Sequence, residues 1–196
     1  MTLVEDLAEI TATEYDDYFT ESHYINSLNN AQDHIFSSLM AIEKGRGSRV
    51  SDLDQYRAQI TQTITPVRLE SGFFYSTSNV PFGAIKDYII IDARDITMKY
   101  LMDYDKYELF HGNAYPTPYE GYFYIMENLV HVYFGVPVEN YRLVYIRKPE
   151  PITVSTIDTI ARRAVLYYAA HLLVQIDTTL PSEQYLQVAN EYLQTV

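Results

Sequence analysis

The feature that most constrains the fold is a change in hydrophobic periodicity along the chain. Between Ser22 and Lys44, apolar residues recur at three- and four-residue steps, which is the spacing of an amphipathic helix. After about residue 60, Thr, Val, Ile, Phe and Tyr dominate, which is typical of strands. Helical spacing returns after about residue 155. The sequence therefore predicts an α+β fold with N-terminal helices, a central antiparallel β region and C-terminal helices.

The same pattern sets the expected organisation. We expect a single domain over residues 1–196, because this length can bury a sizeable core. Within it, residues 1–60 are expected to be helical, 61–150 β-rich, and 151–196 helical again.

Capping signals refine the N-terminal helices. Thr2 and Glu5 have the spacing of a capping box, so a short helix is expected there. Gly45 and Gly47 are expected to end the helix that begins near Ser22. A short helix is predicted from Ser51 to about Gln59.

Four stretches between residues 65 and 148 are expected to be strands or strand pairs. They are "TPVRLESGFFYSTS", "KDYIIIDARDITMKYL", "GYFYIMENLVHVYFG" and "YRLVYIRK". The third is expected to be a hairpin that turns at Glu127-Asn128. After the last strand, Pro149 and Pro151 stop the sheet, because proline cannot donate a ladder hydrogen bond. These prolines also predict a stiff elbow before the next helix.

That helix is expected to be capped at Ser155 and to run to about Ile176. Its residues are apolar nearly all round, which indicates burial on more than one side. The side that carries Leu166, Ala170 and Leu173 is expected to be buried against the β region or an adjacent subunit. A final helix, with Pro181 in its first turn, is expected to reach about Gln194.

The segment from Asp103 to Gly121 is expected to be a long loop. It carries several aromatic residues, among them Tyr107, Phe110, Tyr115 and Tyr119. Exposed aromatic residues in a loop usually mark a contact surface, so we expect these to bind a neighbouring protein. The alternative is that the loop folds back over its own sheet.

Charge and cysteine content exclude several classes of site. The net charge is −12, which argues against groove binding to nucleic acid but allows DNA to slide past without adhering. The absence of cysteine excludes disulfides and thiolate metal sites. It fits a reducing compartment.

No residue pattern predicts catalysis. None of the five histidines has metal-ligand spacing. His111, near Asp103 and Asp105, could form a carboxylate–histidine site, although a polar surface loop is the preferred interpretation. His171 is interpreted as a satisfied core or interface histidine, and His131 as an ordinary strand residue. Walker and GxSxG motifs are absent, so we expect no enzyme, no metal and no cofactor.

One basic glycine-rich segment, "EKGRGSR" at residues 43–49, is a candidate binding site. Lys44, Arg46 and Arg49 could surround a phosphate held on backbone amides, or contact a charged partner. A solvated connection between two helices is the preferred interpretation.

Three stretches carry a resemblance to a known family: "YINSLNNAQDHIFSSL", "RVSDLDQYRAQITQTITPV", and "NYRLVYIRKPEPI" with the following "RRAVLYYAAHLL". Together they cover about half the chain. They resemble the ring-forming head–tail connector (adaptor) proteins of tailed bacteriophages, most closely those of crAss-like phages. That family often has a plainer loop where this chain has "DKYELFHGNAYPTPYEG".

The resemblance implies a structural virion protein without enzymatic activity. Copies would form a ring at the portal vertex, with twelve subunits, that joins head to tail and lines the DNA channel. Its partners would be the portal protein and tail or second-ring proteins, with DNA passing without specific binding and no membrane contact. The chain would be made in the bacterial host cytoplasm and reside at the head–tail junction of the virion. In this setting, a rigid elbow at Pro149 and Pro151 would fix the subunit angle around the ring.

Two alternatives remain open. The chain could be a tail-terminator or second-ring protein of the same assembly. From a different class, it could be a small ligand-binding or enzymatic domain that uses the loop at 103–121.

Overall fold

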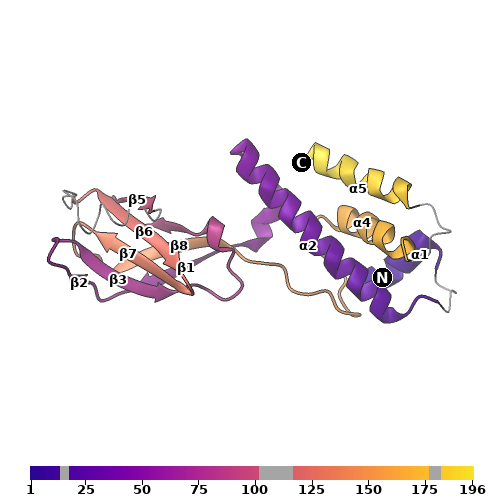
Figure 1. The fold of residues 1–196 in the computed structure, drawn as a ribbon, viewed down its shortest axis with the longest axis horizontal. Coiled ribbons are helices and arrows are strands. Elements are labelled where there is room, and N and C mark those ends of the chain that lie inside the picture. Colours follow the sequence, from indigo (N-terminus) through magenta and orange to yellow (C-terminus); the bar gives the residue numbers. More distant parts are fainter. Residues whose placement is uncertain (14–17, 102–116, 177–181) are drawn as a thin grey trace. The chain divides into compact units, whose positions relative to one another are not determined.

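The chain divides into two compact units, which are described separately. In this computed structural model, the described residues are 1–13, 18–101, 117–176 and 182–196. One unit, the helical unit, comprises Met1–Gln55 and Pro149–Val196, and the other, the β unit, is Tyr56–Lys148. Helices therefore lie at both ends of the chain with the sheets between them (Figure 1), which confirms the predicted α+β fold. That residues 1–196 form a single domain remains a prediction.

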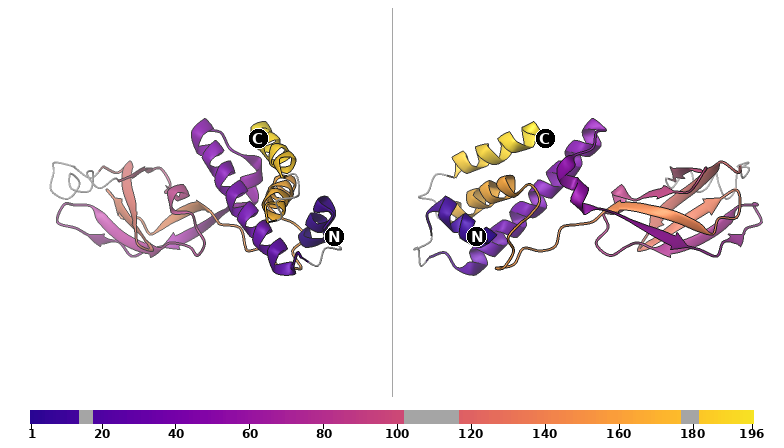
Figure 2. Two further views of the ribbon diagram at one scale, coloured as in Figure 1. Left: turned by 45° about the vertical axis from the view of Figure 1, so that its right-hand side comes forward. Right: turned by 180° about the vertical axis from the view of Figure 1, so that it is seen from behind.

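The described residues of the helical unit form four α-helices and a short 3-10 helix. They are α1 (Leu3–Thr11), α2 (Glu21–Arg46), η1 (Ser51–Tyr56, which ends at the boundary), α4 (Arg162–Val174) and α5 (Glu183–Thr195). Helix α4 contacts α1, α2 and α5, and Figure 2 shows this group of helices from two further sides. Its core consists of apolar residues with no exposed surface, among them Leu3, Leu7, Leu28, Ile35, Leu39, Ala164, Ala169 and Leu173.

The predicted caps of the two N-terminal helices are largely confirmed. Thr2 Oγ1 accepts from the Glu5 amide (3.3 Å), and the Glu5 carboxylate accepts from the Thr2 amide (2.7 Å), which closes the capping box. Helix α2 runs slightly beyond the predicted range at both ends. It ends at Gly47, whose φ of 64° is left-handed, whereas Gly45 lies inside the helix.

The predicted start of the next helix at Ser155 is wrong. Helix α4 begins only at Arg162, and its N-cap residue, Ala161, has a left-handed backbone. The preceding segment is held by side chains of α2. Asn29 Oδ1 accepts from the Ile152 amide (2.8 Å), and Gln32 donates to the Glu150 carbonyl (2.9 Å). Because these side chains satisfy its backbone, the segment is stable without being helical.

The predicted extent of the helix from Ser51 to Gln59 is also wrong. It is a 3-10 helix that stops at Tyr56. Strand β1 (Arg57–Thr63) begins at the next residue, because its whole length pairs antiparallel with β8 (Asn140–Ile146). Ladder pairing therefore decides the conformation of residues 57–59.

The β unit contains two sheets. The first has the order β1-β8-β4, with β4 at Ile90–Asp92. The second has the order β2-β3-β7-β6-β5. Its strands are β2 (Val67–Arg68), β3 (Phe74–Asn79), β5 (Thr97–Tyr100), β6 (Glu120–Met126) and β7 (Leu129–Phe134). All pairs of described strands are antiparallel except β5 with β6, which is parallel, so the second sheet is a mixed sheet. The short 3-10 helix η2 (Lys86–Tyr88) precedes β4.

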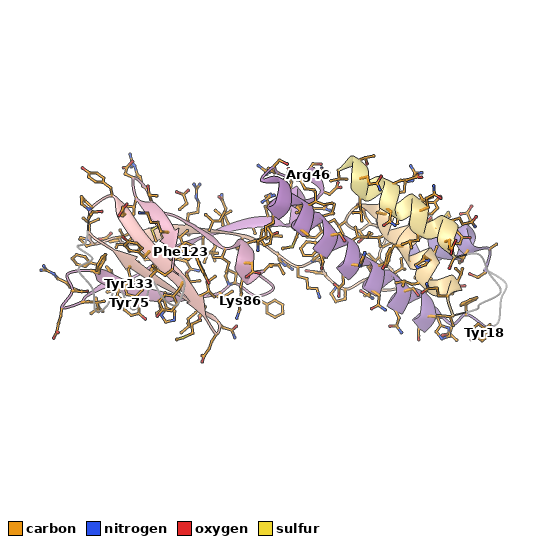
Figure 3. All side chains as sticks on the ribbon, turned by 45° about the horizontal axis from the view of Figure 1, so that its top comes forward. Tyr18, Arg46, Tyr75, Lys86, Phe123 and Tyr133 are labelled. Carbon is orange, nitrogen blue, oxygen red and sulfur yellow. The ribbon has the colours of Figure 1, made fainter. Side chains whose placement is uncertain are left out.

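The two sheets share one core. Buried Tyr141 and Leu143 of β8 and Ile91 of β4 pack with Phe123 of β6 and the inward residues of β7. Those β7 residues are Val130, Val132 and Phe134, and each is fully buried. The predicted hairpin is formed by β6 and β7, and Glu127 at its turn has a φ of 55°. Figure 3 shows Phe123 among these strands.

Candidate interaction surfaces

The residues expected to face another subunit on α4 are covered by the chain itself. Leu166 is 5% exposed, and Ala170 and Leu173 have no exposed surface. The predicted burial is confirmed, but its cause is packing inside the helical unit, where α4 contacts three other helices. No surface is left at these three residues for a partner.

Of the loop aromatics named as a contact surface, Tyr107, Phe110 and Tyr115 lie outside the described residues, and so does His111. Tyr119 is described, and its side chain is 71% exposed just before β6. It is therefore available to a neighbouring protein, as expected, and its role as a contact remains a prediction.

The basic segment at residues 43–49 does not form an amide cradle. Lys44 and Arg46 lie in the last turn of α2, where the free backbone groups are carbonyls and the helix dipole is negative. The two cations therefore stabilise the helix end, and a phosphate would meet oxygen atoms there. Arg49 pairs with Asp54, with 2.6 Å between Nε and Oδ1. Figure 3 shows Arg46 at the end of α2, and contact of these residues with a charged partner remains a prediction.

Two of the described histidines, His131 and His171, are buried in the fold. His171 is 9% exposed, and its Nδ1 lies 3.0 Å from the Ser182 carbonyl and its Nε2 lies 3.0 Å from Gln175 Nε2. The interpretation of His171 as a satisfied core histidine is therefore confirmed. His131 stacks on Tyr124, with ring centroids 4.4 Å apart, and its Nδ1 lies 2.9 Å from the Tyr75 hydroxyl.

His131 belongs to an aromatic cluster on the second sheet. Tyr75, Tyr124 and Tyr133 surround it, and Tyr75 and Tyr133 lie 4.9 Å apart between ring centroids (Figure 3). Burial raises the pKa of Tyr133 and of Tyr75 above the ordinary tyrosine value. The two phenols thus stay neutral, which suits a packed core and gives no base for catalysis.

The β unit carries a shallow hollow with several charged residues in its lining. It encloses about 340 Å³ and is lined by Thr61, Asp92, Arg94, Asn140, Tyr141 and Arg142. Its charges are paired, since Arg142 binds Asp92 and Arg94 lies 3.7 Å from Asp95. Burial raises the pKa of Tyr141, whose hydroxyl hydrogen-bonds to Ser78. These contacts tie Asp92, Arg142 and Tyr141 to neighbouring side chains of the β unit.

Metal ligands do not gather elsewhere in the described ranges. Within residues 1–13, 18–101, 117–176 and 182–196, no group of three or more His, Asp or Glu side chains is placed to hold a metal ion. None of the helices in these ranges has the length and apolar character needed to cross a membrane.

The two units differ sharply in charge. The helical unit contains 16 Asp and Glu residues against 5 Lys and Arg residues, a net charge of −11. The β unit contains 10 against 9, a net charge of −1. Nearly all of the net negative charge therefore belongs to the helical unit, and the overall composition does not reveal this division.

The most exposed large apolar side chain among the described residues of the β unit was not predicted to be functional. Phe82 is 98% exposed and occupies the second position of a tight turn from Pro81 to Ala84. The Ala84 amide donates to the Pro81 carbonyl (3.1 Å), and Gly83 has a φ of 75°, as a type II turn requires at its third position. The signal was present in the sequence, since an apolar residue between Pro and Gly is placed by the turn to point into solvent.

A second exposed apolar site lies in the helical unit, in the segment that precedes α4. Ile157 is 68% exposed and Val154 is 44% exposed. Ile157 lies in the range that the sequence predicted to be a helix buried on more than one side, and its exposure follows from the late start of α4. We call residues 153–158 the Ile157 loop.

Comparisons with known proteins do not place the chain in a family. No family model matches it, and no significant match to a curated protein is found. The fold defines the chain as an α+β protein with a helical unit made from both ends of the described chain and a β unit between them.

Proposed function

We propose that the chain is a structural virion protein whose copies form an oligomeric ring at the portal vertex of a tailed phage. The ring joins head to tail and lines the channel through which DNA passes. The proposal keeps the twelve-fold copy number that the family resemblance implies. Its partners are further copies of the chain, the portal protein and a tail or second-ring protein.

The observation that carries the proposal is the charge of the helical unit. A net charge of −11 on residues 1–55 and 149–196 repels a polyanion at short range. A channel wall with this property lets duplex DNA slide without adhering, because specific or non-specific binding needs clustered Lys and Arg. The few basic residues of this unit are partly engaged, since Arg49 pairs with Asp54 and Arg162 with Asp6.

The absence of a reactive constellation among the described residues is consistent with a structural role. Among these residues, His131, His171, the buried tyrosines and the charged residues of the hollow make contacts inside the fold. A place in the tail-terminator or second ring of the same assembly uses the same acidic wall and differs only in the partner.

Electron microscopy of the purified full chain, together with native mass spectrometry, tests the proposal. Closed rings with a central channel and a mass of twelve subunits are expected. A gel-shift assay at about 50 mM salt should show no retention of duplex DNA. A monomer or a two-fold dimer at every concentration tested, or stable DNA binding, would overturn the proposal.

A further inference from the structure

The turn that carries Phe82 is rigid on both sides. The Val80 amide donates to the Asn128 carbonyl (2.8 Å), and the Ile85 amide donates to the Ile146 carbonyl (2.8 Å). The Lys148 amide donates to the carbonyl of Gly83 (2.9 Å). These bonds fasten the turn to the hairpin and to β8 while Phe82 stays 98% exposed. An aromatic side chain held in this way loses little entropy on docking, which is the property of an interface anchor.

The Ile157 loop is held with similar firmness on the helical unit. The Leu3 amide donates to the Thr156 carbonyl (2.9 Å), and the Thr156 amide donates to the Thr153 carbonyl (3.1 Å). Downstream, the Thr159 hydroxyl donates to Gln32 Oε1 (2.6 Å). Ile157 and Val154 are therefore exposed apolar side chains on a hydrogen-bonded backbone, and exposed apolar groups suit contact with an aromatic side chain.

The charges of the two units affect which surfaces of two copies can come into contact. Two helical units repel one another, since each carries −11, whereas the β unit carries only −1. Exposed Lys86, Arg147 and Lys148 neighbour the Phe82 turn, with Asp87 as a nearby carboxylate. Asp158 is exposed in the Ile157 loop. The basic side chains beside the Phe82 turn and the carboxylate of Asp158 are complementary in charge, whereas two helical units repel one another.

We propose that Phe82 of one copy docks on the Ile157 loop of the next copy in a head-to-tail contact. The two surfaces belong to different units of one chain, so the contact is heterologous and repeats from copy to copy. A heterologous contact generates a ring when its rotation closes. The inference rests on the proposed function, because it names the subunit contact of the proposed ring.

The absence of native cysteine allows a direct test in the full chain. Phe82→Cys and Ile157→Cys are made separately, mixed and oxidised, and the products are separated on a non-reducing gel. The mixture should give a disulfide-linked dimer. The double variant should give a ladder of covalent oligomers. The matched control pairs Ile157→Cys with Val67→Cys, which is 62% exposed on β2 of the β unit, and should give no specific product.

Other outcomes count against the contact. Dimers of Phe82→Cys alone would show a two-fold contact instead. A double variant that yields only an internally bridged monomer would show that Phe82 docks on its own chain. A mixture that gives no more product than the Val67→Cys control would overturn the inference.

A second measurement avoids disulfide chemistry. Phe82→Ser should weaken self-association at least tenfold by sedimentation, with unchanged circular dichroism because the side chain is exposed. Val67→Ser should leave association unchanged. If Phe82→Ser and Val67→Ser both self-associated as strongly as the parent does, the proposed contact would also be overturned. If rings form but the cross-link does not, this inference is wrong and the proposed function is unaffected. If the cross-link forms but the linked chains never close into a ring, the proposed ring is wrong.

Discussion

Ala170 shows how one small side chain sets the spacing of the helical unit. It has no exposed surface and lies on α4, which contacts α1, α2 and α5. A methyl group at this position lets neighbouring backbones approach closely, so a longer side chain would have to displace a helix. The residue therefore governs packing inside the subunit.

Ala170→Glu should lower the free energy of unfolding by about 3 kcal/mol or more, because it buries a carboxylate without a partner. Chemical denaturation followed by circular dichroism measures the change. The matched control is Ala41→Glu, at an exposed position of α2, which should cost less than about 0.5 kcal/mol. Equal stability of the two variants would show that the α4 face is open to solvent.

At the scale of elements, η1 and α5 are joined by one hydrogen bond. The Tyr192 hydroxyl donates to Asp52 Oδ2 at 2.6 Å. Burial and this bond raise the pKa of Tyr192 to about 12 from the ordinary value of 10.0. Since the neutral phenol is the form that the fold favours, the contact stabilises fully below pH 10 and is lost as the pH rises toward 12.

The free energy of unfolding should therefore fall between about pH 10 and pH 12, and part of that fall belongs to Tyr192. Denaturation curves of the parent and of Tyr192→Phe across this range measure its share. Tyr192→Phe should be less stable than the parent at pH 8 and should lose less on going to pH 12. Tyr119→Phe, at a side chain that is 71% exposed, should follow the parent. Identical pH profiles for Tyr192→Phe and the parent would contradict the assignment.

Local signals determined the elements that the sequence predicted well. The capping box at Thr2, the periodicity of α2 and the hairpin turn at Glu127 depend on neighbouring residues. The start of α4 depends on Asn29 and Gln32, which bind residues 150–159 from far along the chain, so no local pattern could predict it. For the same reason, the range predicted to be a buried helix wrongly included Ile157. The exposure of Phe82, in contrast, follows from a turn whose proline and glycine are visible in the sequence.

At the scale of the whole molecule, the uneven charge is the dominant feature. A net charge of −11 on the helical unit destabilises its compact form by self-repulsion. Salt screens this repulsion, because the Debye length falls from about 30 Å at 0.01 M to about 8 Å at 0.15 M.

The thermal midpoint of the helical unit should rise when NaCl is increased from about 0.01 M to about 0.15 M. Far-ultraviolet circular dichroism follows the helices directly. Replacing exposed Glu9 and Glu191 together by Gln should raise the midpoint at low salt and shrink its dependence on salt. A midpoint that falls with salt, or the same salt response in the double variant, would show that repulsion is not the controlling term.

The course of the chain between the two units has a consequence for folding during synthesis. The β unit is one continuous stretch, Tyr56–Lys148, and its first and last residues lie beside each other, since the Arg147 amide donates to the Tyr56 carbonyl (2.8 Å). It can fold on the ribosome as soon as residue 148 has emerged. Helices α1 and α2 leave the ribosome before the β unit, yet the face of α2 that carries Leu28, Ile35 and Leu39 packs on α4, which is made after it. The helical unit therefore begins synthesis before the β unit and finishes folding after it.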